Sequence, residues 1–202
     1  MQALARIATI VLLAASAAAC SRTTRWVDVA RGEDGSTTRV ERATRHAFTG
    51  GELSQAARRW PAYYSLRATH PASGQAVAWD GSFGLVPVLL EFSPRETWLV
   101  AYANRCDAEI LDSGSERFPY VFQVSVDGRH WKTVPASAFP ARFTRANLSS
   151  DWHDDGRIRQ PDDIARSNTA METSTGHHFS AQIPRSFAGW NYPHKDQPSG
   201  CS

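Results

Sequence analysis

The sequence predicts a mainly β domain, either an antiparallel sandwich or an α+β body, with short helices in its C-terminal third. Apolar and polar residues alternate along several segments, and the longest apolar stripe is Phe118, Tyr120, Phe122, Val124 and Val126. Alternation with period two is typical of strands that bury one face. Turn signals separate these segments at intervals typical of antiparallel sheets, and they are centred at residues 70–74, 80–81, 93–94 and 112–114.

The first part of the body is predicted to be a hairpin followed by a short helix. A strand at residues 25–29 leads into the Asp-Gly turn of residues 33–36 and a second strand at 37–48. Because this second strand is polar and rich in arginine, we expect it at an edge of the sheet or facing solvent. Residues 52–60 predict one or two helical turns, which Pro61 would end.

The middle of the chain gives the clearest strand signals. Apolar residues there share one face of each predicted strand, and they are Tyr64, Leu66 and Ala68, then Val88, Leu90 and Phe92, then Trp98, Val100 and Tyr102. Asp127-Gly128 predicts a two-residue hairpin loop of the primed type. That register would place Val124 opposite Trp131.

The C-terminal third is predicted to hold a helix and a last strand. Pro161 suits the first position of a helix, and the carboxylates of Asp162 and Asp163 suit its positive end. Gly176 follows a plausible helix end. Residues 177–183 are expected to form a final strand.

Length and charge limit the classes of protein that this chain can represent. A chain of 202 residues suits one domain, and 42% hydrophobic residues with seven tryptophans indicate a folded body. The net charge is only +2, and the arginines that supply most of the positive charge are scattered singly. Nucleic-acid binding needs basic residues clustered on one face, so we expect no nucleic-acid partner.

The N-terminus has the order of a secretory signal peptide. Arg6 is followed by a brief apolar run at residues 7–15 and by small residues at 16–19. The apolar run is shorter than the roughly 20 residues that a spanning helix needs. We therefore expect export and removal of this segment.

The residues before Cys20 allow two forms of cleavage. Ala17-x-Ala19 would satisfy an ordinary signal peptidase and release a secreted protein. The same residues followed by Cys20 resemble the lipobox of bacterial lipoproteins, although that family usually has leucine where this chain has Ala17. An odd number of cysteines also favours lipidation, because a modified Cys20 leaves Cys106 and Cys201 as a pair for a disulfide in an oxidising compartment.

The resemblance to lipoproteins implies both an address and a domain organisation. The thiol of Cys20 would carry acyl chains, and Ser21, in the place where aspartate favours the inner membrane, implies the periplasmic side of the outer membrane. The expected parts are a signal peptide at 1–19, a lipidated tether at 20–24, one β-rich domain at 25–190 and a Pro-rich tail at 191–202.

The body resembles small uncharacterised lipoproteins of high-GC proteobacteria. The resemblance is carried by short segments, which are Gly51-Glu-Leu-Ser-Gln-Ala, Trp60-Pro, His70-Pro-x-Ser-Gly and Pro119-Tyr-Val-Phe. It implies lineage and lipidation and brings no known activity with it.

One segment resembles part of an EF-hand calcium loop. Asp151, His153 and Asp155 lie at loop positions one, three and five, Gly156 provides the bend, and Asp162 falls at position twelve. Histidine is a poor calcium ligand, however, two arginines lie within the loop, and the closing residue is Asp where the motif has Glu. The alternative is an Asp-Asp-Gly turn ahead of a helix.

Other residue types with binding chemistry have weaker patterns. His177 and His178 would point to opposite faces of a strand, which disfavours a shared metal ion. Trp152 and Trp190 lie outside the strand stripes and are candidates for stacking on sugar rings. The sequence contains no nucleophile elbow, phosphate loop or dinucleotide fingerprint, so we expect no cofactor.

These observations lead to three functional hypotheses. The first is a non-enzymatic interaction or structural module, anchored to the outer membrane through Cys20, that binds another envelope protein. The second is a glycan- or peptidoglycan-binding module that uses Trp152 or Trp190. The third is a metal-assisted hydrolase around Asp151, Asp155 and Asp162.

Overall fold

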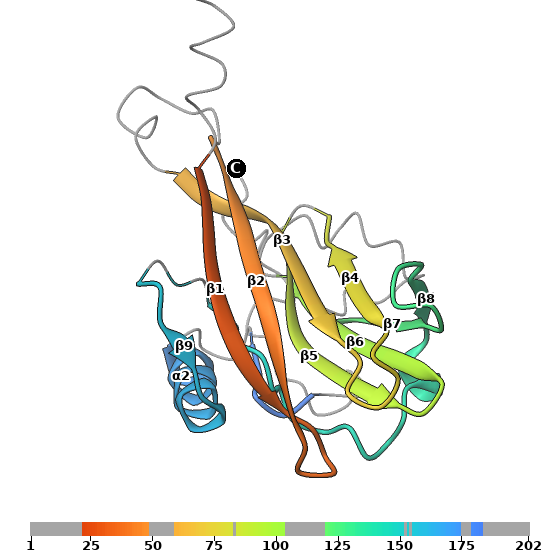
Figure 1. Cartoon of the computed structure of the whole chain (residues 1–202). Coiled ribbons are helices and arrows are strands. Elements are labelled where there is room, and N and C mark those ends of the chain that lie inside the picture. The colour runs from red at the N-terminus through yellow and green to blue at the C-terminus, as the bar shows by residue number, and fades with distance from the viewer. Residues whose placement is uncertain are drawn as a thin grey trace, which may run out of the picture.

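Two β-sheets form the body of the protein (Figure 1), which confirms the predicted mainly β class. The computed structural model describes residues 22–48, 59–82, 84–103, 120–151, 153, 155–174 and 179–183. The first sheet has the strand order β4-β3-β2-β1-β9, with bounds β1 Arg22–Arg31, β2 Thr37–Phe48, β3 Arg59–Thr69, β4 Ala76–Asp80 and β9 Ile158–Arg159. The second has the order β5-β6-β7-β8, with bounds β5 Leu85–Ser93, β6 Glu96–Ala103, β7 Tyr120–Ser125 and β8 Lys132–Val134.

The first hairpin is confirmed and is longer than the sequence indicated. β1 and β2 pair antiparallel from Arg22 opposite His46 to Arg31 opposite Thr37. Gly35 turns the chain between them with a φ of 79°, a conformation that glycine adopts without steric cost. The hairpin therefore runs the whole length of the sandwich, with its turn at the end opposite the start of β1 (Figure 1).

The arginine-rich strand was predicted at an edge of the sheet or facing solvent. The edge position is wrong, whereas one face of β2 is exposed, with Arg39, Glu41 and Arg45 alternating with buried residues. β2 is not an edge strand but lies between β1 and β3. Arg42, at the centre of β2, is buried because its guanidinium reaches the buried carboxylate of Asp28 on β1. Polarity alone suggested an edge strand, because it does not show that Arg42 has an ion-pair partner on the neighbouring strand.

Two further expectations need correction. The helix expected at residues 52–60 is contradicted at its end, because β3 begins at Arg59; residues 52–58 lie outside the described part. The hairpin after β7 is also wider than predicted, since Val124 pairs with Lys132 and not with Trp131. Asp127 accounts for the wider turn, because its carboxylate accepts three local hydrogen bonds that fold residues 126–131 into a compact loop.

Strands β5 and β6 of the second sheet are buried on both faces. Its inner face packs against the first sheet, and β5 is buried at seven successive positions. Aromatic residues from the later part of the chain cover the other face, where Phe139 packs edge-on against Trp98 and Phe179 packs against Tyr102. The η2 turn (Ala136–Ala138) precedes Phe139 in this covering segment. One continuous core joins these layers.

The predicted helix is present as α2, Pro161–Ser174, beside β1 and β9 (Figure 1). Ile164 and Asn168 form its buried face. Of the last predicted strand, residues 177–178 lie outside the described part, and Gln182 forms only an isolated bridge with Arg145. None of the helices in the described ranges has the length and hydropathy needed to cross a membrane.

Candidate functional site

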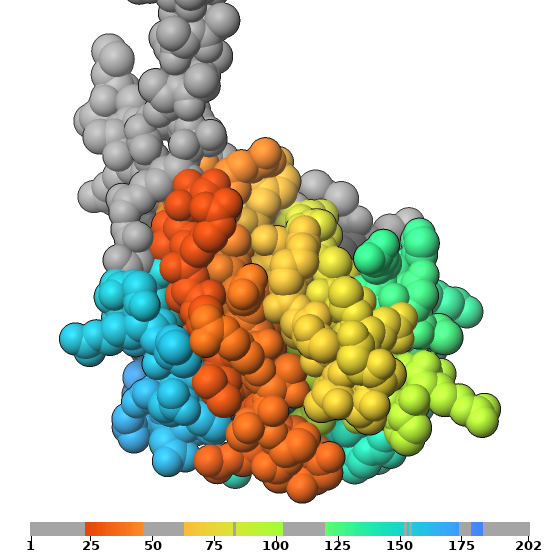
Figure 2. All heavy atoms as spheres, in the orientation of Figure 1, coloured from red at the N-terminus to blue at the C-terminus, as the bar shows by residue number. Residues whose placement is uncertain are grey.

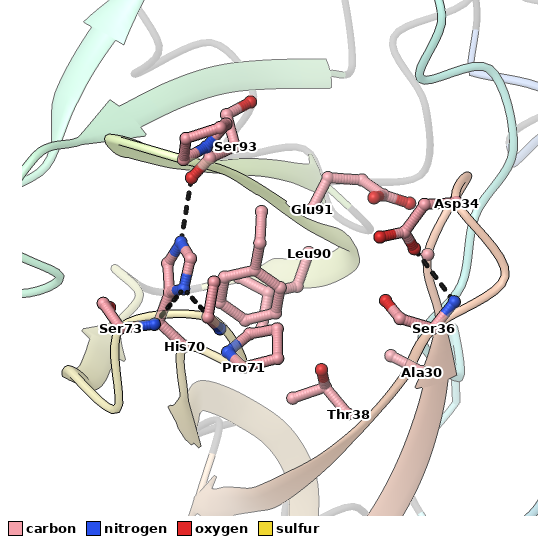
Figure 3. A pocket seen from close by; sticks show the side chains of 14 residues that line it. Ala30, Asp34, Ser36, Thr38, His70, Pro71, Ser73, Leu90, Glu91 and Ser93 are labelled. Carbon is pink, nitrogen blue, oxygen red and sulfur yellow. Dashed lines mark hydrogen bonds between the residues drawn. The ribbon is translucent and has the colours of Figure 1, made fainter.

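A pocket of about 270 Å³ opens at the end of the sandwich that carries the β1–β2 turn. The β3–β4 turn and the β5–β6 turn border it as well, so three loops and both sheets contribute to its wall (Figure 3). Its lining residues are Ala30, Gly32, Asp34, Ser36, Thr38, His70, Pro71, Ala72, Ser73, Leu90, Glu91, Phe92, Ser93 and Pro94. The wall therefore combines an apolar part with a group of carboxylates and hydroxyls.

Glu91 is the buried charge of this pocket. It is only 5% exposed, on β5 of the second sheet. Its carboxylate accepts a hydrogen bond from the side-chain amide of Asn147 at 3.0 Å and a long one from the backbone N–H of Glu33 at 3.5 Å. Among the described residues, no cationic nitrogen forms an ion pair with it.

The surroundings of Glu91 oppose its ionisation. Burial raises its pKa from the ordinary 4.5 to about 7, and the negative charges of Glu33 and Asp34 act in the same direction. The positive charge of Arg142 lowers the pKa, but that guanidinium donates to Ser93 and stacks over Phe143. Near pH 7 the carboxylate is consequently divided between its two protonation states.

Asp34 differs from Glu91 although both line the same pocket. Asp34 accepts a hydrogen bond from the backbone N–H of Ser36 at 2.9 Å. Hydrogen bonds from the side chain and the backbone of Ser36 lower the pKa of Asp34, so it is ionised at neutral pH. The pocket therefore holds one permanent negative charge beside one that titrates near neutrality.

Gly32 brings the two carboxylates together. A Cβ atom at this position would lie 3.0 Å from Oδ1 of Asp34 and 3.4 Å from Oε2 of Glu91. Both oxygens thus approach the same point, which Figure 3 shows as facing carboxylates.

His70 forms a fixed part of the pocket wall. Its Nδ1 accepts hydrogen bonds from the backbone N–H groups of Ala72 and Ser73, so the proton lies on Nε2. Nε2 donates to the carbonyl of Ser93 at 2.8 Å, and the ring packs edge-on against Phe92. Nδ1 therefore holds the β3–β4 turn together, and Nε2 joins this turn to β5.

A second buried carboxylate lies between the sheets, away from the pocket. Asp28 accepts from Nη1 of Arg42 at 2.7 Å and from the N–H and hydroxyl of Ser149 at 3.0 and 2.8 Å. Arg42 also donates to the carbonyl of Pro87 at 3.0 Å, and its guanidinium lies 5.2 Å from the ring centre of Trp26. Burial lowers the pKa of Arg42, and the Asp28 carboxylate opposes that shift. This group is a structural network that joins the two sheets and Ser149.

Several buried polar atoms near this network lack a hydrogen-bond partner among the described residues. They are Nε1 of Trp26, Nε of Arg42, Oγ1 of Thr44, Oγ of Ser150 and Nε2 of His153. The ring of His153 packs edge-on against Trp26, and burial lowers the pKa of His153. None of these residues lines the pocket.

The residues of the predicted calcium loop are engaged separately. Asp155 pairs with Arg159 at 2.6 Å, which together with its hydrogen bond from Arg157 lowers the pKa of Asp155. Asp162 is largely exposed at the start of α2 and lies 3.7 Å from Arg31, while Asp151 is half-buried. Within the described ranges, no group of three potential ligands is arranged to hold a metal ion.

The other sequence-based candidates lie outside the described residues and stay predictions. They are Cys20, Cys106, Cys201, Trp152, Trp190, His177 and His178.

Sequence analysis did not single out Glu91. The signal that identifies it is its place in the run of residues 85–92, which is apolar except for this one carboxylate. Because a strand with such a run is buried on both faces, its single charge must also be buried. Comparisons of this chain with protein-family models, with curated proteins and with solved structures find no match.

Proposed function

We propose that this protein is a lipid-anchored binding module of the bacterial envelope that holds a basic side chain of a partner protein in the pocket around Glu91. One observation carries the proposal: Glu91 is a buried carboxylate without a cationic partner among the described residues, in the wall of an open pocket. A charge in this situation raises the energy of the free protein. A ligand that supplies the missing cation recovers that energy on binding.

The rest of the wall limits which cation fits. Leu90, Phe92 and Pro71 give the pocket an apolar part, while Asp34 and Glu91 lie together at one side (Figure 3). A lysine side chain matches both, because its ammonium group can contact the carboxylates while its four-carbon stem lies on the apolar wall. A bare metal ion would leave that apolar wall unused.

An anchor at Cys20 would lie at the end of the first sheet opposite the pocket. Cys20 is two residues before Arg22, the first residue of β1, so acyl chains on its thiol would lie within about 7 Å of the strand. β1 then runs ten residues, about 30 Å, to the turn that borders the pocket. Anchoring at Cys20 would therefore leave the pocket accessible to a partner in the periplasm.

Binding of a lysine analogue tests the pocket directly. The probe is N-acetyl-lysine amide, the control ligand is N-acetyl-norleucine amide, which lacks the amine, and the readout is the NMR shift of the backbone amides of Asp34, Ser36 and Glu91. We expect saturable shifts with the lysine probe only. Glu91→Gln should abolish them, whereas Glu41→Gln, an exposed carboxylate on the outer face of β2, should leave them unchanged.

A second variant blocks the pocket without removing charge. Gly32→Ala places a methyl group between the two carboxylates, and Gly32 has no positive φ that would strain an alanine. It should weaken binding of the lysine probe although both carboxylates remain. Equal binding of the two ligands, or full binding by Glu91→Gln, would overturn the proposed pocket.

The address and the partner are tested in cells. Intact mass of the protein purified from membranes should show acyl chains on Cys20, and an unmodified mass in the soluble fraction would refute the anchor. Gentle cross-linking should capture an envelope protein with the native chain and with Glu41→Gln. Capture should fail with Glu91→Gln. Equal capture by all three chains would show that the partner does not bind through this pocket.

A further inference from the structure

A basic and aromatic patch lies on the outer face of the first sheet, at the end near the proposed anchor. Figure 2 shows this face, which β1 to β4 form. We define the anchor patch as Arg25 on β1, Arg45 on β2 and Tyr63 on β3, all three exposed. These side chains therefore present two positive charges and a phenol ring on one surface.

Strand register places the patch close to Cys20 in the chain. Arg45 lies opposite Thr23 and Tyr63 lies opposite Arg45, so this row of the sheet is only three residues beyond Cys20. Arg25 lies one row farther, opposite Ala43. With about 3.3 Å per residue along a strand, both arginines lie within about 17 Å of the proposed lipid attachment.

The two patch residues on neighbouring strands are also preorganised. The guanidinium carbon of Arg45 lies 4.4 Å from the centre of the Tyr63 ring. Stacking holds the planar guanidinium in place and leaves its N–H groups available for a phosphate. Tyrosine is itself enriched at the membrane–water interface, where its polar end meets head groups.

The acidic residues that the structure describes on this outer face do not neutralise the patch. Asp80 on β4 lies in the same row as Arg25 on β1, three strands away, so that about 14 Å separate the two residues. Both carboxylate oxygens of Asp80 accept hydrogen bonds from Arg67. Glu41 lies opposite Arg67, one row nearer the pocket end. The row that contains Arg45 and Tyr63 has no carboxylate among the described residues.

We infer that the anchor patch docks on the anionic phospholipid head groups of the membrane that the anchor enters. This inference rests on the proposed anchor, because acyl chains on Cys20 would bring the patch to the surface in the first place. The anchor holds the protein on the membrane, and the patch fixes how the body is oriented there. In that orientation the pocket around Glu91 points away from the lipid.

Vesicle binding by a chain without acyl groups tests the patch separately from the anchor. The sample is the mature chain from residue 20 with Cys20→Ser, and the vesicles contain either phosphatidylcholine alone or phosphatidylcholine with phosphatidylglycerol. We expect binding to the anionic vesicles only, weakening as salt is added. Arg25→Gln/Arg45→Gln should reduce partitioning about 25-fold, since each arginine near an anionic surface contributes about fivefold.

A matched pair of substitutions controls for net charge. Arg39→Gln/Arg129→Gln removes the same charge from exposed positions outside the patch and should change partitioning much less. Equal losses with both pairs, or equal binding to both kinds of vesicle, would overturn the inference. Intact mass from membranes reports on the anchor alone, so either proposal can fail while the other stands.

Discussion

Two buried carboxylates, Asp28 and Glu91, have opposite environments in this fold. Asp28 is fully buried and receives one cation and two neutral donors, from Arg42 and Ser149. Glu91 is nearly as buried, yet it receives only neutral N–H groups, from Asn147 and Glu33. The first carboxylate has its complement within the chain, and the second does not have one among the described residues.

This difference distinguishes a charge that stabilises the fold from one that can bind a ligand. A carboxylate whose oxygens are all engaged by a cation and hydrogen-bond donors of the protein joins the elements that carry them. It has no free acceptor for a ligand. A carboxylate with raised pKa beside a pocket is a candidate for binding. The comparison therefore predicts that changes at Asp28 act on stability, and that changes at Glu91 act on pH dependence and binding.

The largest expected effect is on the network of Asp28. Arg42→Met leaves a buried carboxylate without its cation and should lower the free energy of unfolding by about 3–5 kcal/mol. Chemical denaturation followed by tryptophan fluorescence measures this loss. The matching variant Arg42→Met/Asp28→Asn removes both charges and keeps a side-chain oxygen that accepts from Ser149, so it should recover part of the stability. A double variant as unstable as the single one would contradict this account of the network.

A smaller effect, with a defined pH dependence, is expected at Glu91. Because its pKa is higher in the folded state, about 7 against the ordinary 4.5, the folded protein binds more protons between these values. Its contribution to stability is therefore complete below pH 4.5 and is lost as the pH rises through 7. With allowance for solvent screening, that loss is about 2 kcal/mol.

Glu91→Gln should remove this dependence. The amide keeps an oxygen for Asn147 and carries no charge, so the variant should be more stable than the native chain at pH 8 and similar to it at pH 4.5. Urea denaturation at the two pH values checks this. Glu41→Gln is the control, and an unchanged pH slope in Glu91→Gln would show that another group is responsible.

The smallest expected effect is at an exposed ion pair of similar geometry. Arg67 donates to both oxygens of Asp80 at 2.9 and 3.0 Å, yet both side chains are about half exposed or more. Because water screens such a pair, Asp80→Asn should change the free energy of unfolding by less than about 1 kcal/mol. Chemical denaturation of Asp80→Asn and Arg42→Met under the same conditions compares the two pairs. Equal losses in the free energy of unfolding would show that burial does not set the energy of these pairs.

Much of the fold was predictable from short-range patterns. Alternation located β3 and β5 to β7, the Asp-Gly turn located the first hairpin, and Pro161 with two aspartates located α2. These features follow from residues close together in the sequence, which is the range over which patterns are reliable.

The arrangement of charges was not predictable in the same way. The strand that contains Arg42 was expected at an edge or facing solvent, because the partner of Arg42 lies fourteen residues away on another strand and sequence spacing does not show that pairing. The pocket was even harder to predict from the sequence, because Gly32, His70 and Glu91 come from three separate parts of the chain. Only the folded register brings them together, and the long turn at Asp127 likewise depended on side-chain hydrogen bonds.

The pKa of Glu91, measured by carbon-13 NMR of its carboxyl group, tests the central claim most directly. We expect a value near 7 in the free protein, and a lower value when N-acetyl-lysine amide is bound, because the ammonium group favours the ionised carboxylate. Affinity for the probe should rise up to tenfold per pH unit below that pKa and level off above it. A free-state pKa near 4.5, unchanged by the probe, would contradict the claim that Glu91 is an unpaired buried carboxylate that binds a cation.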